Sequence, residues 1–139
     1  MPKLEHINLA VRNMEPTLGF LKAAFPGWRN RGEGSRPWYG HPQNWLHFGD
    51  DDFYLTLNDN AVGEQRDLKG HAPGLAHIGF EVPSLDRLIE RLRVAGFEPD
   101  HMGEDHPHRR NVYYLDGEGL EFEFVEYFSY IPEEKNLYV

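Results

Sequence analysis

The sequence predicts an α+β fold built from two pseudo-symmetric halves. Three observations support this prediction: a repeated strand-like segment, a helix-like segment after each copy, and a hairpin-like segment after each helix. Residues 4–11 match residues 75–82 at a shift of 71, and both segments alternate apolar and polar side chains. Alternation with a period of two is typical of a half-buried β-strand.

Each repeated strand is followed by a stretch with helical spacing. Residues 85–95 place leucine, isoleucine and alanine on one face and charged residues on the other, which indicates an amphipathic helix. Ser84 is suited to cap the start of this helix, and Gly96 to end it. In the first copy the pair Pro26 and Gly27 ends the corresponding helix.

Two short alternating runs complete each half. Residues 45–48 and 53–57 flank a Gly/Asp-rich turn, and residues 112–115 and 120–124 repeat this arrangement at a shift of 67. Such turns between alternating runs predict hairpins. The stretches 29–44 and 98–111 are poorly patterned, and each has room for a strand at its start followed by a mobile loop.

Composition excludes several classes of protein. The 139 residues include no cysteine, eight histidines and 23 acidic against 14 basic side chains, for a net charge of −9. A disulfide framework is therefore excluded, and the acidic balance argues against binding to nucleic acid or to an anionic membrane surface. No secretory signal is visible at the N-terminus and no apolar run reaches the ~20 residues that span a bilayer, so we expect a cytoplasmic protein.

The repeat singles out three side chains on the strand faces that do not pack against the helices. His6 and His77 occupy equivalent places, and Glu123 lies on the corresponding face of the last strand. If the two open faces meet in one concave surface, these three can share a divalent metal, because two imidazoles and a carboxylate form a known metal site. The mates of Glu121 and Glu123 in the first half are Tyr54 and Thr56.

The segments 4–11, 74–82 and 114–124 resemble the three recurrent segments of the vicinal oxygen chelate superfamily, also called the glyoxalase/bleomycin-resistance/extradiol-dioxygenase superfamily. The resemblance implies two βαβββ modules that form a cupped mixed sheet with helices on the outside. It gives one glyoxalase-like domain, with modules at about 3–60 and 74–128, a linker at 61–73 and a tail at 129–139. It places the metal ligands at His6, His77 and Glu123.

The resemblance also suggests what the metal does. Many members have a fourth protein ligand, which here falls at Thr56 or Tyr54, and neither is a carboxylate or an imidazole. This departure argues against glyoxalase I activity and leaves dioxygenase-type or lyase/isomerase-type chemistry on a small substrate with vicinal oxygens. The ion is one of Fe, Mn, Zn, Ni or Co. The alternative is a metal-free protein that sequesters a ligand or drug, as bleomycin-resistance proteins do.

Further residues are candidates for contact with the substrate. We expect acid–base roles for Glu121 and Tyr54, and substrate contacts from a second group of side chains: Thr56, His47, Tyr113 and Arg109. The histidines of residues 101–108 are expected in a solvated loop that can border the site. The arginines and aromatics of residues 29–45 are candidates for a pocket mouth. The aromatic tail after residue 127 covers the fold or joins a subunit interface, and the family resemblance implies a homodimer.

Overall fold

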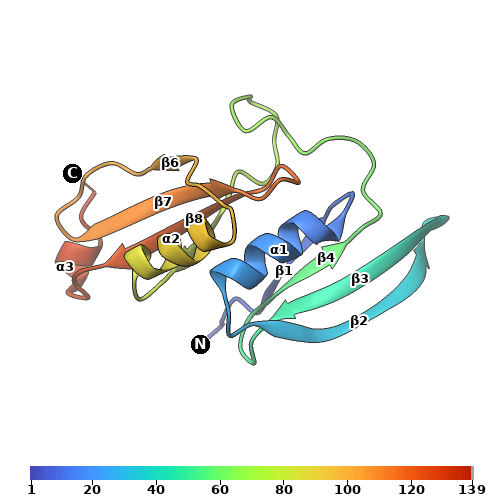
Figure 1. Ribbon diagram of the computed structural model, residues 1–139, viewed down its shortest axis with the longest axis horizontal. Coiled ribbons are helices and arrows are strands. Elements are labelled where there is room, and N and C mark those ends of the chain that lie inside the picture. Colours follow the sequence, from blue (N-terminus) through green and yellow to red (C-terminus); the bar gives the residue numbers. More distant parts are fainter. Residues whose placement is uncertain (139) are drawn as a thin grey trace. The chain divides into compact units, whose positions relative to one another are not determined.

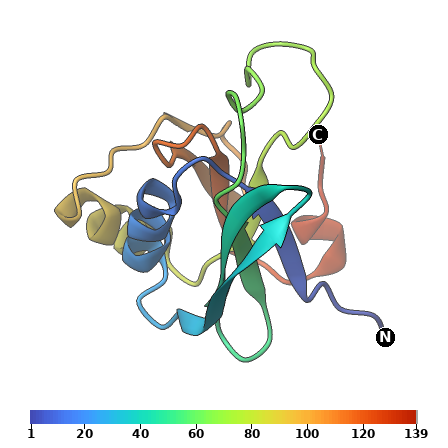
Figure 2. The ribbon, with the colours of Figure 1, turned by 90° about the vertical axis from the view of Figure 1, so that its right-hand side faces the viewer.

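The computed structural model describes residues 1–138, which divide into two compact units, Met1–Gln65 and a second that begins at Arg66. Both units are α+β and repeat the same order of elements, as Figure 1 shows. Residues 59–77 contain neither strand nor helix, and Figure 2 shows them as a long green loop. None of the described helices is long and apolar enough to cross a membrane.

The first unit has one helix and four strands. The elements are β1 (His6–Ala10), α1 (Met14–Ala24), β2 (Arg29–Trp38), β3 (His41–Gly49) and β4 (Tyr54–Asn58). The sheet order is β1-β4-β3-β2, with β1 parallel to β4 and the other pairs antiparallel. The Asn13 side chain caps α1 by accepting a hydrogen bond from the backbone N–H of Glu15.

The second unit repeats this topology. Its elements are β5 (Ile78–Glu81), α2 (Leu85–Val94), β6 (His101–Met102), β7 (Arg109–Leu115), β8 (Glu121–Tyr127) and the short α3 (Pro132–Lys135). The sheet order is β5-β8-β7-β6, again with one parallel pair, β5 and β8. Ser84 caps α2 as predicted, and Gly96 follows its end with a φ of 94°.

The strand register confirms the repeat that the sequence predicts. Asn8 pairs with Thr56 in the first unit and Gly79 with Glu123 in the second, which reproduces the shifts of 71 and 67. The helix-side faces of these sheets form the core of each unit. The core includes the following apolar side chains, all fully buried: Phe20, Leu21, Leu55, Leu57, Leu88, Leu92, Val112, Tyr114, Phe122 and Phe124.

The prediction of a loop in the later part of residues 29–44 is wrong. Strands β2 and β3 run through this stretch and end in a two-residue turn at Tyr39 and Gly40, where both φ angles are positive, as in a type I′ hairpin. Almost every residue of β2 is exposed or half-exposed, so the strand lacks the apolar alternation by which strands are recognised. The short helix α3 also has no counterpart in the prediction.

The core of α2 gives a direct test of this packing. Leu88 is fully buried, whereas Val94 on the same helix is 73% exposed. We expect Leu88→Ala to lower the free energy of unfolding by about 2–5 kcal/mol, because it removes buried apolar surface and leaves a cavity. Val94→Ala is the matched control and should change it by less than about 0.5 kcal/mol. Urea denaturation followed by circular dichroism measures both.

Candidate metal and substrate site

In the second unit, two carboxylates lie against the imidazole of His77, which directly precedes β5. The Nε2 atom of His77 is 3.0 Å from Oε2 of Glu123, and its Nδ1 atom is 3.5 Å from Oε1 of Glu121. Both carboxylates project from β8 on the face opposite the buried Phe122 and Phe124, because side chains alternate along a strand. The three side chains keep 16–38% of their surface exposed, so a ligand can reach them.

The second oxygen of Glu123 is held by a neighbouring strand. Asn111 of β7 donates a hydrogen bond from Nδ2 to Oε1 of Glu123 at 2.9 Å, and its Nδ2 also lies 3.3 Å from the Tyr113 hydroxyl. Oε2 is thereby left on the side of His77. Burial and the negative charge of Glu123 raise the pKa of Tyr113, so its hydroxyl stays protonated. Sequence analysis missed Asn111, which falls in the poorly patterned stretch 98–111.

Gly103 provides the space that the Asn111 side chain occupies. A Cβ atom at position 103 would lie 1.8 Å from Oδ1 of Asn111, far inside van der Waals contact. The two residues are also joined through the backbone, where the N–H of Gly103 donates to the carbonyl of Asn111 at 2.9 Å. A side chain at residue 103 would therefore displace the amide that orients Glu123.

In the first unit, a row of rings crosses the open face of the sheet from β3 through β4 to β1. Trp45 lies beside His47, His47 stacks on Tyr54 at 4.6 Å between ring centroids, and Tyr54 stacks on His6 at 4.9 Å. Nδ1 of His6 is 3.0 Å from the Glu5 carboxylate. As in the second unit, the predicted ligand histidine has a carboxylate at Nδ1.

The surroundings of His47 favour its neutral form. Burial, the guanidinium of Arg31 and the nearby His6 all lower the pKa of His47 below 6.5. The same guanidinium lies 4.2 Å from the centre of the Tyr54 ring, which is the geometry of a cation–π contact. A neutral imidazole can accept a hydrogen bond or a proton from a ligand.

A cavity of about 240 Å³ opens next to this row of rings. It is lined by His6, Asn8, Arg36, Trp45, His47, Tyr54, Thr56 and Asn58. Thr56 and Asn58 are only 5% and 6% exposed although they lie on the open side of the sheet. Asn58 donates to Oδ1 of Asn8. The cavity is thus lined mainly by hydrogen-bonding groups.

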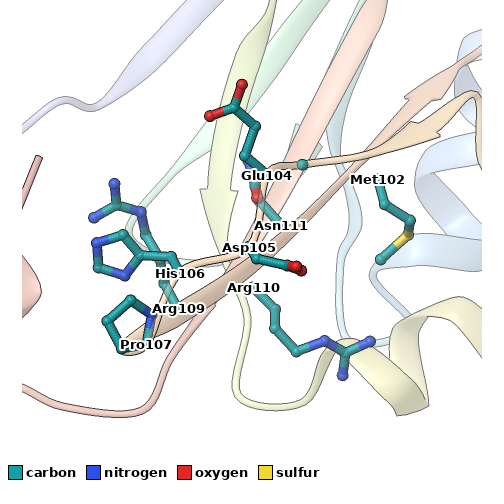
Figure 3. A pocket seen from close by; sticks show the side chains of 9 residues that line it. Met102, Glu104, Asp105, His106, Pro107, Arg109, Arg110 and Asn111 are labelled. Atoms are coloured by element: carbon teal, nitrogen blue, oxygen red, sulfur yellow. The ribbon is translucent and has the colours of Figure 1, made fainter. Parts of the chain in front are cut away.

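Larger hollows border the loop between β6 and β7. One cavity of about 560 Å³ is lined in part by His101, Asn111, Tyr113 and Tyr138, so it begins at the residues around Glu123. Figure 3 shows the neighbouring hollow, where His106 and Arg109 lie on one side of β7 and Arg110 on the other.

The C-terminal segment forms one wall of the 560 Å³ cavity. Arg109 donates to the backbone carbonyls of Lys135 and Leu137, and His106 donates to the carbonyl of Leu137 at 2.8 Å. The aromatic tail covers part of its own unit in this way. Arg109, which we predicted to contact substrate, is the residue that fastens this segment.

The predicted site residues fall into two groups, one in each unit. His6, His47, Tyr54 and Thr56 lie on the open face of the first sheet, and the second sheet brings together His77, Tyr113, Glu121 and Glu123. Within residues 1–138, the structure contains no group of three or more histidine or acidic side chains arranged to hold a metal ion. The pair His77 and Glu123 still fits a divalent cation, because its Nε2 and Oε2 atoms face each other and both are metal-binding donors.

The comparisons with known proteins place the chain in a family. The model of the Glyoxalase/Bleomycin resistance protein/Dioxygenase superfamily matches residues 3–124. The chain therefore belongs to this superfamily, and the resemblance seen in the sequence is confirmed. No curated protein matches the chain.

Solved structures share the fold at low sequence identity. A glyoxylase/bleomycin resistance protein/dioxygenase domain from Frankia sp. EAN1pec is 21% identical, covers 99% of each chain and gives a TM-score of 0.73. The fosfomycin resistance protein FosX from Listeria monocytogenes is 19% identical, covers 96% of this chain and 98% of its own, and gives 0.69. The E126Q mutant of that FosX, complexed with Mn(II) and 1S,2S-dihydroxypropylphosphonic acid, is 18% identical, covers 96% and 97%, and gives 0.69.

The lowered pKa of His47 predicts how stability depends on pH. The unfolded chain binds this proton more readily than the folded protein, so stability is fully present above a pH of about 6.5 and falls as the pH drops below it. We expect His47→Gln to lose less free energy of unfolding than the wild type between about pH 7.5 and pH 5.5. Urea titrations at several pH values measure this, and His71→Gln, at an exposed position in the loop formed by residues 59–77, is the control. Parallel curves for His47→Gln and the wild type would contradict the prediction.

Proposed function

We propose that this protein is a metal-dependent enzyme that acts on a small substrate with oxygens on neighbouring atoms. The proposed ligands are His77 and Glu123 of the second unit and His6, which holds the equivalent strand position in the first. The observation that carries the proposal is the orientation of the two imidazoles. Each has a carboxylate at Nδ1, from Glu5 or Glu121, so Nε2 is the nitrogen available to a metal, and in His77 it faces Oε2 of Glu123, the other proposed ligand of that unit. Metal-bound histidines are commonly oriented by such a carboxylate.

A divalent cation bound there would polarise a substrate oxygen as a Lewis acid and stabilise developing negative charge. The chain's own groups supply the remaining functions. Glu121 orients His77, and its half-buried carboxylate is the proposed proton acceptor. Tyr113 stays protonated and can donate a hydrogen bond to a substrate oxygen. In the first unit, Thr56, His47 and Tyr54 line a cavity beside His6 and are proposed substrate contacts.

The relatives support the chemical class without fixing the reaction. A FosX structure holds Mn(II) together with a dihydroxypropylphosphonic acid, a small molecule with hydroxyl groups on neighbouring carbons. We therefore propose that this chain binds one divalent ion, which is Fe, Mn, Zn, Ni or Co. The proposed reaction is of the dioxygenase type or of the lyase/isomerase type. The homodimer and the cytoplasmic location inferred from the sequence stay predictions.

Metal titration of single-residue variants tests the ligand set. We expect the wild type, purified without a histidine tag, to bind one divalent ion, measured by calorimetry with Mn(II) and Zn(II) and by elemental analysis. His77→Ala, Glu123→Gln and His6→Ala should each weaken binding by more than about 100-fold, because loss of a direct ligand exceeds the 10–100-fold effect of its supporting groups. His71→Ala is the control and should bind as the wild type does.

Two outcomes of this titration would contradict the proposal. Absence of binding for every divalent metal would favour the metal-free ligand-sequestering protein as the function. Binding that survives in both His77→Ala and Glu123→Gln would place the metal elsewhere. A thermal-shift assay separates the two functions further, because a bound metal raises the melting temperature of the enzyme, whereas only organic ligands do so for a sequestering protein.

Asn111 should affect the metal site through Glu123. Asn111→Leu removes the donor that holds Oε1 of Glu123 and frees the carboxylate to rotate. We expect Mn(II) affinity to fall by about 10–100-fold while the fold is retained, as for other groups that support a ligand. Arg110→Gln changes the adjacent residue, whose side chain contacts Asp86 instead, and should leave Mn(II) affinity unchanged. Equal affinities of the two variants would exclude this role for Asn111.

A further inference from the structure

The first unit contains an exposed arginine, Arg36, whose Nε–H group is hydrogen-bonded while the four N–H groups of its two terminal nitrogens stay free. Arg36 of β2 donates from Nε to Oε1 of Gln43 at 2.9 Å, and these two residues are cross-strand partners in the β2–β3 hairpin. Gln43 is only 5% exposed, and its Nε2 donates to Oδ1 of Asn60 at 3.1 Å. The amide of Gln43 is therefore fixed before any ligand arrives, and it fixes the guanidinium in turn.

The two terminal nitrogens of Arg36 have no protein partner. Among the described residues, neither nitrogen donates a hydrogen bond to another side chain or to the backbone. The guanidinium lies 5.2 Å from the centre of the Trp38 ring, a cation–π contact that limits its motion further. The fork of Nη donors is the part of arginine that pairs with both oxygens of a carboxylate or a phosphate at once.

Arg36 lines the 240 Å³ cavity of the first unit together with His6. None of the lining residues is acidic, although the chain as a whole carries a net charge of −9. The other lining groups include the Thr56 hydroxyl and the Asn8 amide, which can donate hydrogen bonds. A cavity that combines a pre-oriented guanidinium with neutral donors and no carboxylate is complementary to an anion.

The indole of Trp45 forms part of the wall of this cavity. Its ring lies across Gly34, its cross-strand partner, where a Cβ atom would come within 2.8 Å of the indole. The indole therefore packs closely on the backbone of β2 at Gly34. Its Nε1–H group also provides a spectroscopic reporter at the cavity wall.

We propose that this cavity binds an anionic oxygen group of the substrate, a carboxylate, phosphate or phosphonate, with Arg36 as its receptor. The inference rests on the proposed function, because it assigns the substrate of that site to the class of small anions. Gln43 acts as a positioning residue for Arg36. The anionic group of the substrate is then held within the first unit, in the cavity that the proposed ligand His6 also lines.

Titration with simple anions tests the proposal without knowledge of the substrate. Acetate and methylphosphonate are added to ¹⁵N-labelled, metal-free protein at constant ionic strength, and the Trp45 indole and the Asn8 and Asn58 amide signals are followed. Saturable shifts are expected for at least one of the two anions, and the stronger response identifies the kind of anion. Acetamide, the neutral counterpart of acetate, should cause no shift. Equal shifts with acetamide, or shifts confined to other residues, would overturn the proposal.

Variants assign the binding to Arg36. Arg36→Gln should weaken anion binding by at least about tenfold, as expected for loss of a charge-assisted hydrogen bond, and Arg36→Lys should restore only part of it because lysine lacks the fork. Arg93→Gln, which removes a cation outside the cavity, should bind as the wild type does. Unchanged affinity in Arg36→Gln would overturn the proposal.

The same variants separate this proposal from the proposed function. Arg36→Gln should retain the wild-type affinity for Mn(II), because Arg36 is not a proposed ligand. Anion binding in a protein that takes up no metal would leave the anion site standing and remove the metal-dependent function. Metal uptake without anion binding at Trp45 would leave the metal-dependent function standing and remove the anion site. Each proposal can therefore fail by itself.

Discussion

In each unit the first strand pairs in parallel with the last, and the register of this pair determines which side chains can act together. Phe122 and Phe124 of β8 are fully buried, while Glu121 and Glu123 alternate with them on the open face. A slip of one residue would turn both carboxylates into the core and both phenylalanines outward. Burial of these two rings stabilises the register by several kcal/mol, so the core also fixes the contacts of His77.

The repeat made this register predictable from the sequence. The match of residues 4–11 to 75–82, and of the two hairpins to each other, makes Thr56 the equivalent of Glu123, and the strand pairings reproduce both shifts. Strand faces followed from apolar alternation, because the residues on the helix side of the central strands, such as Leu55 and Leu57 in β4, are apolar. His77, Glu121 and Glu123 were accordingly assigned to one face, and in the structure both carboxylates lie within 3.5 Å of a nitrogen of His77.

Residues outside the repeat pattern were not predictable in the same way. Strand β2 is exposed on both faces, so hydrophobic periodicity carried no information about it, and the pairing of Arg36 with Gln43 depends on that strand. Asn111 lies in the stretch 98–111, whose histidines and prolines show no strand periodicity, so the start of β7 could not be recognised there. Its contact with Glu123 comes from neighbouring strands in three dimensions, and a single sequence holds no signal for such a contact.

The first unit has Tyr54 and Thr56 at the positions that Glu121 and Glu123 occupy in the second unit, and this difference has an evolutionary consequence. A module present twice supplies two equivalent open faces, and only one of them has to keep its acidic side chains. The first copy, which lacks these acidic side chains, lines its cavity with an arginine, two imidazoles and neutral polar groups instead. Under the proposed function, mutations around Arg36 can change which molecule is recognised without altering the proposed metal ligands His6, His77 and Glu123.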